Sequence, residues 1–296
     1  MTGSDAGRRI QAAAGARRAS LKTGERTLRL ERTRIMAVLN LTPDSFSDGG
    51  RFLSGSRVDV GRVRSEAEAM LAAGADILDI GGESTRPGSA PVSEPEELER
   101  VIPVLNALLE LDTIVSVDTR KPAVARAALS AGCHLINDVG GLTSPAMLEA
   151  VAESDAGICI MHMQGEPTDM QADPRYEDVV AEVRQFLLGQ LELARQSGIP
   201  DERICLDPGF GFGKTLEHNL ALLRSLAELR IDGLPLLVGL SRKRMIGTLT
   251  GAGVDERMPG SVAAAVLAAE RGADILRVHD VGETAQALAI LEALRT

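Results

Sequence analysis

The stretch TIVSVDTRKPAVARAALSAGCHLIND, residues 113–138, shows the repeating unit from which the fold can be predicted. It contains an apolar run, Thr113–Asp118, then an alanine-rich segment, Pro122–Ala131, and a second apolar run, His134–Asp138. A proline in the first turn favours a helix start at Pro122. Short apolar runs on either side of a helix are typical of parallel strands that are covered on both faces. Residues 113–138 therefore predict a strand, a helix and a second, parallel strand.

The same alternation continues in both directions along the chain. The eight candidate strands are Ile35–Asn40, Ile77–Gly81, Thr113–Asp118, His134–Asp138, Ile158–His162, Ile204–Asp207, Leu236–Leu240 and Ile275–His279. Candidate helices lie around Val60–Ala73, Glu94–Leu111, Pro122–Ala131, Pro145–Ala152, Tyr176–Ser197, Leu216–Leu229, Pro259–Arg271 and Thr284–Leu294. Successive strands begin roughly 35 residues apart, which is close to the repeat of an eightfold β/α barrel. The sequence thus predicts the α/β class and a single (β/α)8 TIM barrel over residues 34–296.

The beginning of the chain has a different composition from the rest. Residues 1–34 hold nine Lys or Arg and three acidic residues, and alanine is frequent among them. We expect residues 1–33 to be a flexible, irregular N-terminal extension, with an organelle transit peptide as the alternative.

Charge and composition exclude several classes of function. The formal net charge of −10 argues against general binding to nucleic acid or anionic membranes. The sequence contains neither an apolar run long enough for a membrane span nor a secretion signal. The three cysteines, Cys133, Cys159 and Cys205, lack metal-type spacing. We therefore expect a soluble protein of the reducing cytoplasm.

The polar residues that follow the candidate strands indicate a functional site. The carboxyl ends of the strands in a parallel barrel meet at one face, where active sites are built. Asp118 and Asp207 close apolar strands there, and a buried carboxylate needs a partner. That partner is either a salt bridge or loop cap, or a ligand that donates N–H groups. A flat heterocycle with an amino-pyrimidinone edge is such a ligand, and Asn137 could read the rest of the edge.

Cationic residues follow the seventh and eighth strands, where many barrels hold a phosphate. Arg277 lies within an apolar run, so an anionic partner is favoured over exposure to solvent. Arg242 and Arg244 are either solvated charges at a helix start or ligand-binding groups. His162 follows a buried strand and is interpreted as a structural residue. The glycine-rich loop at residues 208–214 has neither a Walker A nor a Rossmann pattern.

Several motifs together resemble the loop signatures of the dihydropteroate synthase family. In chain order they are Asn40–Gly50 (NLTPDSFSDGG), Gly81–Gly88 (GGESTRPG), Asp118–Arg120, Ile136–Asp138, Met161–His162, Asp207–Lys214 (DPGFGFGK), Ser241–Lys243 and Arg277–Asp280. The matches cover residues 34–296 in unbroken order. The resemblance implies a barrel enzyme of folate biosynthesis that joins para-aminobenzoate to 6-hydroxymethyl-7,8-dihydropterin pyrophosphate and releases pyrophosphate.

The resemblance also implies roles for individual residues. The pterin-binding residues would be Asp118, Asn137, Met161, Asp207 and Lys243. Pyrophosphate would be bound by Asn40, through a magnesium ion that Asn40 ligates, and by Arg277 and His279. The para-aminobenzoate site would contain Phe46, Thr85, Arg86, Pro87, Phe212, Lys243 and Arg244. The catalytic residues would be Asp48, Arg86, Lys243, Arg277 and His279.

Further properties of the family are implied in the same way. The members are sulfonamide targets and usually form homodimers through helices away from the active site. Two alternatives stay open on the sequence alone, namely a pterin-binding barrel of the methyltransferase type and a homologue without catalytic activity. A cationic pyrophosphate site argues against the first, and the intact set of polar residues argues against the second.

Overall fold

A computed structural model describes residues 18–42, 53–54, 57–85 and 88–295 of the chain. Eight parallel strands form its centre, and they follow one another around the sheet in the order β10-β9-β8-β7-β6-β3-β12-β11. Their bounds are β3 (Arg34–Asn40), β6 (Ile77–Gly81), β7 (Ile114–Asp118), β8 (Leu135–Asp138), β9 (Gly157–Met161), β10 (Ile204–Asp207), β11 (Leu237–Val238) and β12 (Ile275–Val278). A parallel bridge between Leu206 and Leu236 closes the sheet. The predicted (β/α)8 barrel is therefore confirmed.

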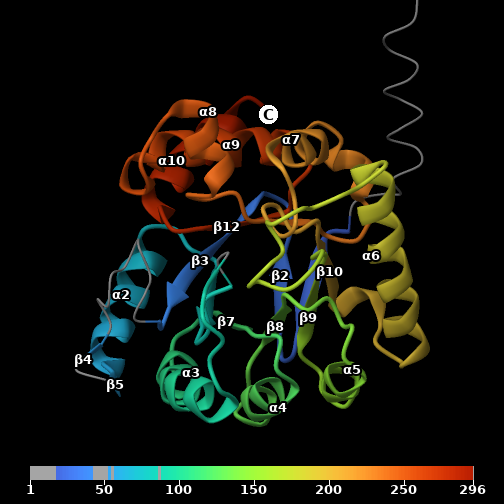
Figure 1. Cartoon of the computed structure of the whole chain (residues 1–296). Helices are drawn as coiled ribbons and strands as arrows, with labels where there is room; N and C mark the ends of the chain where they lie inside the picture. Colours follow the sequence, from blue (N-terminus) through green and yellow to red (C-terminus); the bar gives the residue numbers. More distant parts are fainter. Residues whose placement is uncertain (1–17, 43–52, 55–56, 86–87, 296) are drawn as a thin grey trace, which may run out of the picture.

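Helices surround the strands (Figure 1). Their bounds are α2 (Val60–Ala72), α3 (Glu94–Leu108), α4 (Pro122–Ser130), α5 (Pro145–Ala152), α6 (Val179–Gln196), α7 (Leu216–Arg224), α8 (Arg244–Thr250), α9 (Met258–Glu270) and α10 (Val281–Ala293). Short 3-10 helices lie at Asp201–Arg203, Leu226–Leu229 and Val254–Glu256. A separate pair of short strands, β4 (Leu53–Ser54) and β5 (Arg57–Val58), is antiparallel. No helix in the described part of the chain could span a membrane.

Alternation along each strand produces two separate apolar cores. Side chains of one parity, such as Leu78 and Ile80 of β6, face the surrounding helices and belong to the larger core. Side chains of the other parity point into the barrel. At the end where the strands begin, this second set is an apolar layer formed by Met36, Ile77, Ile114, Leu135, Cys159, Cys205, Leu237 and Ile275. The next inward positions along the same strands are largely polar, and they form the opposite end of the barrel.

An antiparallel hairpin, β1 (Ser20–Thr23) and β2 (Arg26–Arg29), closes the barrel at the apolar end. Leu21, Leu28 and Leu30 are at most 5% exposed and pack in one cluster with the apolar layer. Their burial explains why a segment rich in arginine nevertheless forms regular structure. We expected residues 1–33 to form an irregular extension. For residues 20–29 this expectation was wrong, because they form a regular hairpin that packs on the barrel. Residues 1–17 lie outside the described residues.

The chain after the sixth helical segment also differs from the prediction. The seventh strand was expected over Leu236–Leu240, but β11 covers only Leu237–Val238. Gly239 weakens strand formation, and Arg242 has a left-handed φ of 56° that turns the chain. The unpredicted helix α8 then begins at Arg244. It places Lys243 and Arg244 at the rim of the barrel.

Candidate active site

A cavity of about 960 Å³ opens at the carboxyl ends of the strands. Its lining contains most of the residues that the sequence predicted for the site: Asn40, Thr85, Asp118, Asn137, Met161, Asp207, Phe212, Lys243, Arg244, Arg277 and His279. Four further predicted residues, Phe46, Asp48, Arg86 and Pro87, lie outside the described residues. The structure therefore gathers at one face side chains that lie as far apart in the sequence as Asn40 and His279.

Strand alternation explains why these side chains meet. Asp118 lies four residues after Ile114, and Asn137 lies two residues after Leu135, so each shares the inward parity of its apolar neighbour. Arg277 follows Ile275 in the same way. Each of these three strands thus contributes an apolar side chain to the closed end and a polar side chain to the open end.

A buried ion network lies at the bottom of the cavity. Arg277 donates from Nε to Oδ2 of Asp79 at 2.6 Å and from Nη2 to Oδ2 of Asp118 at 2.7 Å. Asn137 donates from Nδ2 to the same Asp79 oxygen at 3.2 Å. Asp79 is fully buried. The network fixes the side chains of Arg277 and Asn137. It also shows that Asp118 forms a salt bridge with Arg277.

Sequence reasoning missed Asp79. The residue lies in the middle of β6, and only the polar residues at strand ends were considered. It stands two positions after the inward-facing Ile77, and its Cα pairs in register with Ser116 of β7. A carboxylate at an inward position of an otherwise apolar strand is the signal by which it could have been found.

Buried polar atoms without a partner gather in the same place. Among the described residues, hydrogen-bond partners are lacking for the buried atoms Oδ1 of Asp79, Oγ of Ser116, Oδ1 of Asp118 and Oδ1 of Asn137, and for Nε of Arg18 elsewhere. Leaving such a group unsatisfied costs about 1–3 kcal/mol. Three of the four atoms at the site are carboxylate or amide oxygens, which can only accept. The arrangement is therefore suited to a ligand that donates several N–H groups.

Two carboxyl groups that line the cavity, Asp118 and Asp207, have raised pKa values. Burial raises the pKa of Asp118 to about 7, although the charge of Arg277 opposes the shift. Burial also raises the pKa of Asp207, against the charge of Lys243 and a hydrogen bond of 2.7 Å from the Gly209 N–H. For Arg277, burial alone would lower the pKa, but Asp79 and Asp118 raise it above its usual value. Arg277 is therefore charged at every ordinary pH.

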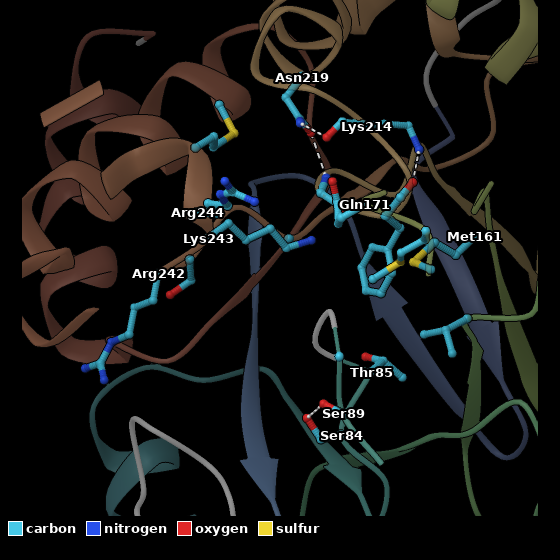
Figure 2. A pocket seen from close by; sticks show the side chains of 18 of the residues that line it. Ser84, Thr85, Ser89, Met161, Gln171, Lys214, Asn219, Arg242, Lys243 and Arg244 are labelled. Atoms are coloured by element: carbon cyan, nitrogen blue, oxygen red, sulfur yellow. Dashed lines mark hydrogen bonds between the residues drawn. The ribbon is translucent and has the colours of Figure 1, made fainter. Parts of the chain in front are cut away.

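Lys243 extends into the cavity beside Arg244 (Figure 2). Its Nζ donates to the carbonyl of Phe210 and lies 4.5 Å from the centre of the Phe212 ring. Burial lowers its pKa to about 8. The neighbouring Arg242 points away from Lys243 in the same view, and its Nε donates to Oδ2 of Asp280 at 3.1 Å. Arg242 thus forms an ion pair with Asp280, an arrangement that neither of the two interpretations from the sequence included.

His279 and Asn40 lie at the outer part of the cavity. The ring Nδ1 of His279 lies 3.0 Å from Oγ of Ser241, which follows β11. Asn40 is the last residue of β3. Within the described ranges, no cluster of three or more His, Cys, Asp or Glu side chains could hold a metal ion. A cation at this face would consequently need ligand atoms from a substrate in addition to the amide oxygen of Asn40.

His162 belongs to a structural cluster, as the sequence indicated. Its Nδ1 lies 2.9 Å from Nζ of Lys214, and its ring packs edge-on against Phe186 with centroids 4.9 Å apart. Burial and the charge of Lys214 lower the pKa of His162 to about 3. The imidazole is therefore neutral at ordinary pH.

Comparison with known proteins agrees with the geometry of the site. Residues 36–279 match the family model described as "Pterin binding enzyme". The dihydropteroate synthase of Escherichia coli K12 is 51% identical over 268 residues, which cover 90% of this chain and 93% of that protein. The Yersinia pestis dihydropteroate synthase, solved with a sulfonamide drug complex, superposes with a TM-score of 0.89 at 49% identity, over 93% of this chain and 99% of that chain. The Burkholderia cenocepacia enzyme, complexed with 7,8-dihydropteroate, has a TM-score of 0.84 at 47% identity, over 94% and 96% of the two chains.

Proposed function

The chain belongs to the dihydropteroate synthases among the pterin-binding enzymes, and on this premise we propose how its own residues carry out the reaction. The enzyme condenses para-aminobenzoate with 6-hydroxymethyl-7,8-dihydropterin pyrophosphate and gives 7,8-dihydropteroate and pyrophosphate. It is a transferase of a pterinylmethyl group.

We assign the deep part of the cavity to the pterin ring. The observation that carries this assignment is the pair of unsatisfied acceptors, Oδ1 of Asp118 and Oδ1 of Asn137, in the lining of the cavity. The amino-pyrimidinone edge of a pterin carries the N–H donors that such atoms need. Asp207 would accept from another N–H, Lys243 would donate to the ring, and Met161 would pack against its face.

The diphosphate is placed at the outer part of the cavity. Asp79 and Asp118 hold the guanidinium of Arg277 in place. From this position Arg277 would contact the diphosphate, and His279 would lie beside the same group. A planar guanidinium binds phosphate oxygens more strongly than a neutral donor does. The arrangement supports stabilisation of charge that develops on the leaving group.

Asn40 is the residue that would contact a magnesium ion. Mg²⁺ in phosphate sites commonly takes one or two protein ligands, and phosphate oxygens and water complete its shell. A single amide oxygen at this position fits that pattern, and it predicts that the ion and the diphosphate bind together. When bound, the ion would neutralise part of the diphosphate charge.

Magnesium binding can be tested without an activity assay. Chelation of Mg²⁺ should weaken binding of the pterin diphosphate about tenfold or more in calorimetry and should leave binding of 6-hydroxymethylpterin unchanged. The Asn40→Ala variant should lose most of this difference. Equal effects of chelation on both ligands would reject the assignment.

The para-aminobenzoate site is proposed at the rim of the cavity. Phe212, Lys243 and the half-buried Thr85 would border the aromatic ring, and Arg244 would lie nearest the carboxylate. The loops that carry Phe46, Asp48, Arg86 and Pro87 would complete the site. Sulfonamides, which resemble para-aminobenzoate in shape, are expected to bind in the same place.

The chemistry needs charge stabilisation and positioning more than a general base. The amine nitrogen of para-aminobenzoate bonds to the pterin methylene carbon while the carbon–oxygen bond to diphosphate breaks, and the bonding electrons leave with the diphosphate. The amine nitrogen then loses a proton to water. Arg277 and His279 would stabilise the leaving anion, and Lys243 would orient both substrates. An arylamine is already nucleophilic, so holding it in line and excluding water supply most of the remaining effect.

The test is product formation from the two substrates with a coupled measurement of pyrophosphate release. We expect one pyrophosphate per dihydropteroate and a raised KM for the pterin substrate in Asp118→Asn. The exposed Asp112, whose ion pair with Arg26 lies at the other end of the barrel, provides the matched control Asp112→Asn. No release with the wild-type protein would support the homologue without catalytic activity. Methyl transfer from methyltetrahydrofolate would support the methyltransferase type.

A homodimer of the cytoplasm is proposed from the surface and the cysteines. Leu267 on α9 and Ile290 on α10 are 42% and 68% exposed, and the two helices contact each other. A second copy would cover these apolar side chains. The three cysteines of the described chain are free and buried, which suits a reducing compartment. Light scattering of Ile290→Glu should show loss of the dimer.

A further inference from the structure

The loop after β10 has irregular backbone, and side chains hold it at every carbonyl from Gly209 to Gly213. Lys214 donates from Nζ to the carbonyls of Gly209 and Phe212 at 2.9 and 3.0 Å. The hydroxyl of Tyr176 donates to the carbonyl of Gly213 at 2.9 Å. The carbonyl of Gly211 accepts from Nε2 of Gln171, and that of Phe210 accepts from Lys243. Five successive carbonyls therefore have a side-chain donor each.

The glycines let this loop lie directly against the loop after β9. Gly209 and Gly213 have left-handed φ angles of 68° and 62°. A Cβ atom at Gly209 would lie 1.8 Å from the carbonyl oxygen of His162, and one at Gly213 would lie 2.2 Å from that of Gln164. Only glycine permits so close an approach of two backbones. The two loops, residues 162–178 and 208–214, are thus packed as one unit.

Two of the donors, Gln171 and Tyr176, belong to the loop after β9 and have no part in the reaction described above. Gln171 reaches the Gly211 carbonyl, and the N–H of the same glycine donates to Oδ1 of Asn219 at 2.7 Å. Figure 2 shows Gln171, Lys214 and Asn219 together on one side of the cavity, with Thr85 on the other. The two peptide groups that flank the Gly211 Cα are therefore each held by a side chain, immediately before Phe212.

We propose that Gln171, Tyr176 and Lys214 are positioning residues for para-aminobenzoate, because they fix the backbone that presents the Phe212 ring beside Lys243. The proposal rests on the assignment of Phe212 to the para-aminobenzoate site. It makes the loop after β9 a determinant of affinity for the second substrate. The pterin contacts at Asp118 and Asn137 come from other strands. Asp207 and Lys243 bond to the loop at the Gly209 N–H and the Phe210 carbonyl, which Gln171 and Tyr176 do not contact.

Steady-state kinetics with both substrates test the proposal. Tyr176→Phe removes one hydroxyl, and Gln171→Leu removes one amide with little change in size. Each substitution leaves a loop carbonyl without its donor, so each should raise the KM for para-aminobenzoate about fivefold. The KM for the pterin substrate should change less than about twofold. Gln185→Leu, at an exposed position of α6, is the matched control and should change neither value.

The outcomes separate this proposal from the proposed function. If the variants keep the wild-type KM for para-aminobenzoate, or if both KM values rise together, the positioning role is rejected. If the wild-type protein forms no dihydropteroate, the proposed function fails instead. Lys214→Met should give the largest rise in the KM for para-aminobenzoate. If it does not fold, Tyr176→Phe and Gln171→Leu still decide the question.

Discussion

The two ends of the barrel are built by the same eight strands and have opposite chemistry. At the closed end, inward-facing apolar side chains pack against Leu21 and Leu28 of the hairpin. At the open end, only one or two inward positions further along each strand, carboxylates, amides and cations line a cavity. A shift of two residues along a strand thus separates a part of the molecule that stabilises the fold from a part that binds substrate.

The energetic difference between the ends follows from their composition. Burying a leucine side chain contributes roughly 1.5–3 kcal/mol, so the hairpin and the apolar layer stabilise the barrel. The open end instead buries carboxylates beside an arginine, and such pairs gain little or nothing over apolar packing. It also leaves several acceptors unsatisfied in the described residues. Substitutions at the two ends should therefore separate stability from catalysis.

The largest effect is expected from Arg277→Ala at the open end. Loss of the guanidinium should lower kcat/KM by roughly 2–4 kcal/mol in transition-state stabilisation, or about 30- to 1000-fold. It should also lower stability, because Asp79 and Asp118 lose their cation. Arg126→Ala, at the exposed surface of α4, is the control. Near-normal turnover of Arg277→Ala would contradict the assigned role.

At the closed end, Leu28→Ala should lower the free energy of unfolding by about 2–3 kcal/mol, since it leaves a cavity in the apolar cluster. Its kcat and both KM values should stay at the wild-type level. Leu193→Ala, at a 43% exposed position, should change stability by less than about 0.5 kcal/mol. Urea denaturation measures the difference. A loss of activity in folded Leu28→Ala would show that the two ends are coupled.

Asp207→Asn sharpens the comparison, because it should affect ligand binding and stability in opposite directions. Burial raises the pKa of Asp207, so the fold favours its neutral form, and stability is lost as pH rises through the raised pKa. The asparagine side chain does not ionise, so the variant does not lose stability in this way. Stability at pH 8 should consequently stay equal or rise, while pterin affinity falls about tenfold. Calorimetry that shows unchanged affinity would reject the pterin contact.

For the wild-type enzyme, a plot of kcat/KM against pH should be bell-shaped and narrow. Asp118 accepts an N–H more strongly when it is ionised, and with a pKa of about 7 its ionised fraction falls as pH drops below 7. Lys243 must be protonated to donate, and with a pKa of about 8 it loses its charge as pH rises above 8. The kcat/KM for the pterin substrate, which reports the free enzyme, should have limbs near these values. Lys243→Arg should move the basic limb upward, and an unmoved limb would assign it to another group.

The fold was largely predictable from sequence because strand and helix periods are local properties. The apolar runs and their polar ends located the strands, and eight repeats predicted a closed barrel with its site at one face. The hairpin β1–β2 was missed because each of its strands has four residues and a cationic residue, Lys22 or Arg29, follows each buried leucine. Its stability comes from packing on the apolar layer, which only the folded barrel provides.

The site was predictable in its residue types but not in its pairing. Asp118 and Arg277 were both identified, yet their mutual ion pair depends on the distance between β7 and β12 across the barrel. The pairing of Arg242 with Asp280 joins the segments that follow two neighbouring strands, β11 and β12. Asp79 was missed because its neighbours in sequence are apolar. In each case the interaction joins residues on different strands, and no local pattern encodes it.

The most direct test of the central assignment is a crystal structure with 6-hydroxymethylpterin diphosphate. The account predicts the ring against Asp118, Asn137 and Asp207, and the diphosphate within hydrogen-bond distance of Arg277 and His279. A ring bound outside the cavity, or a diphosphate directed away from Arg277, would contradict it.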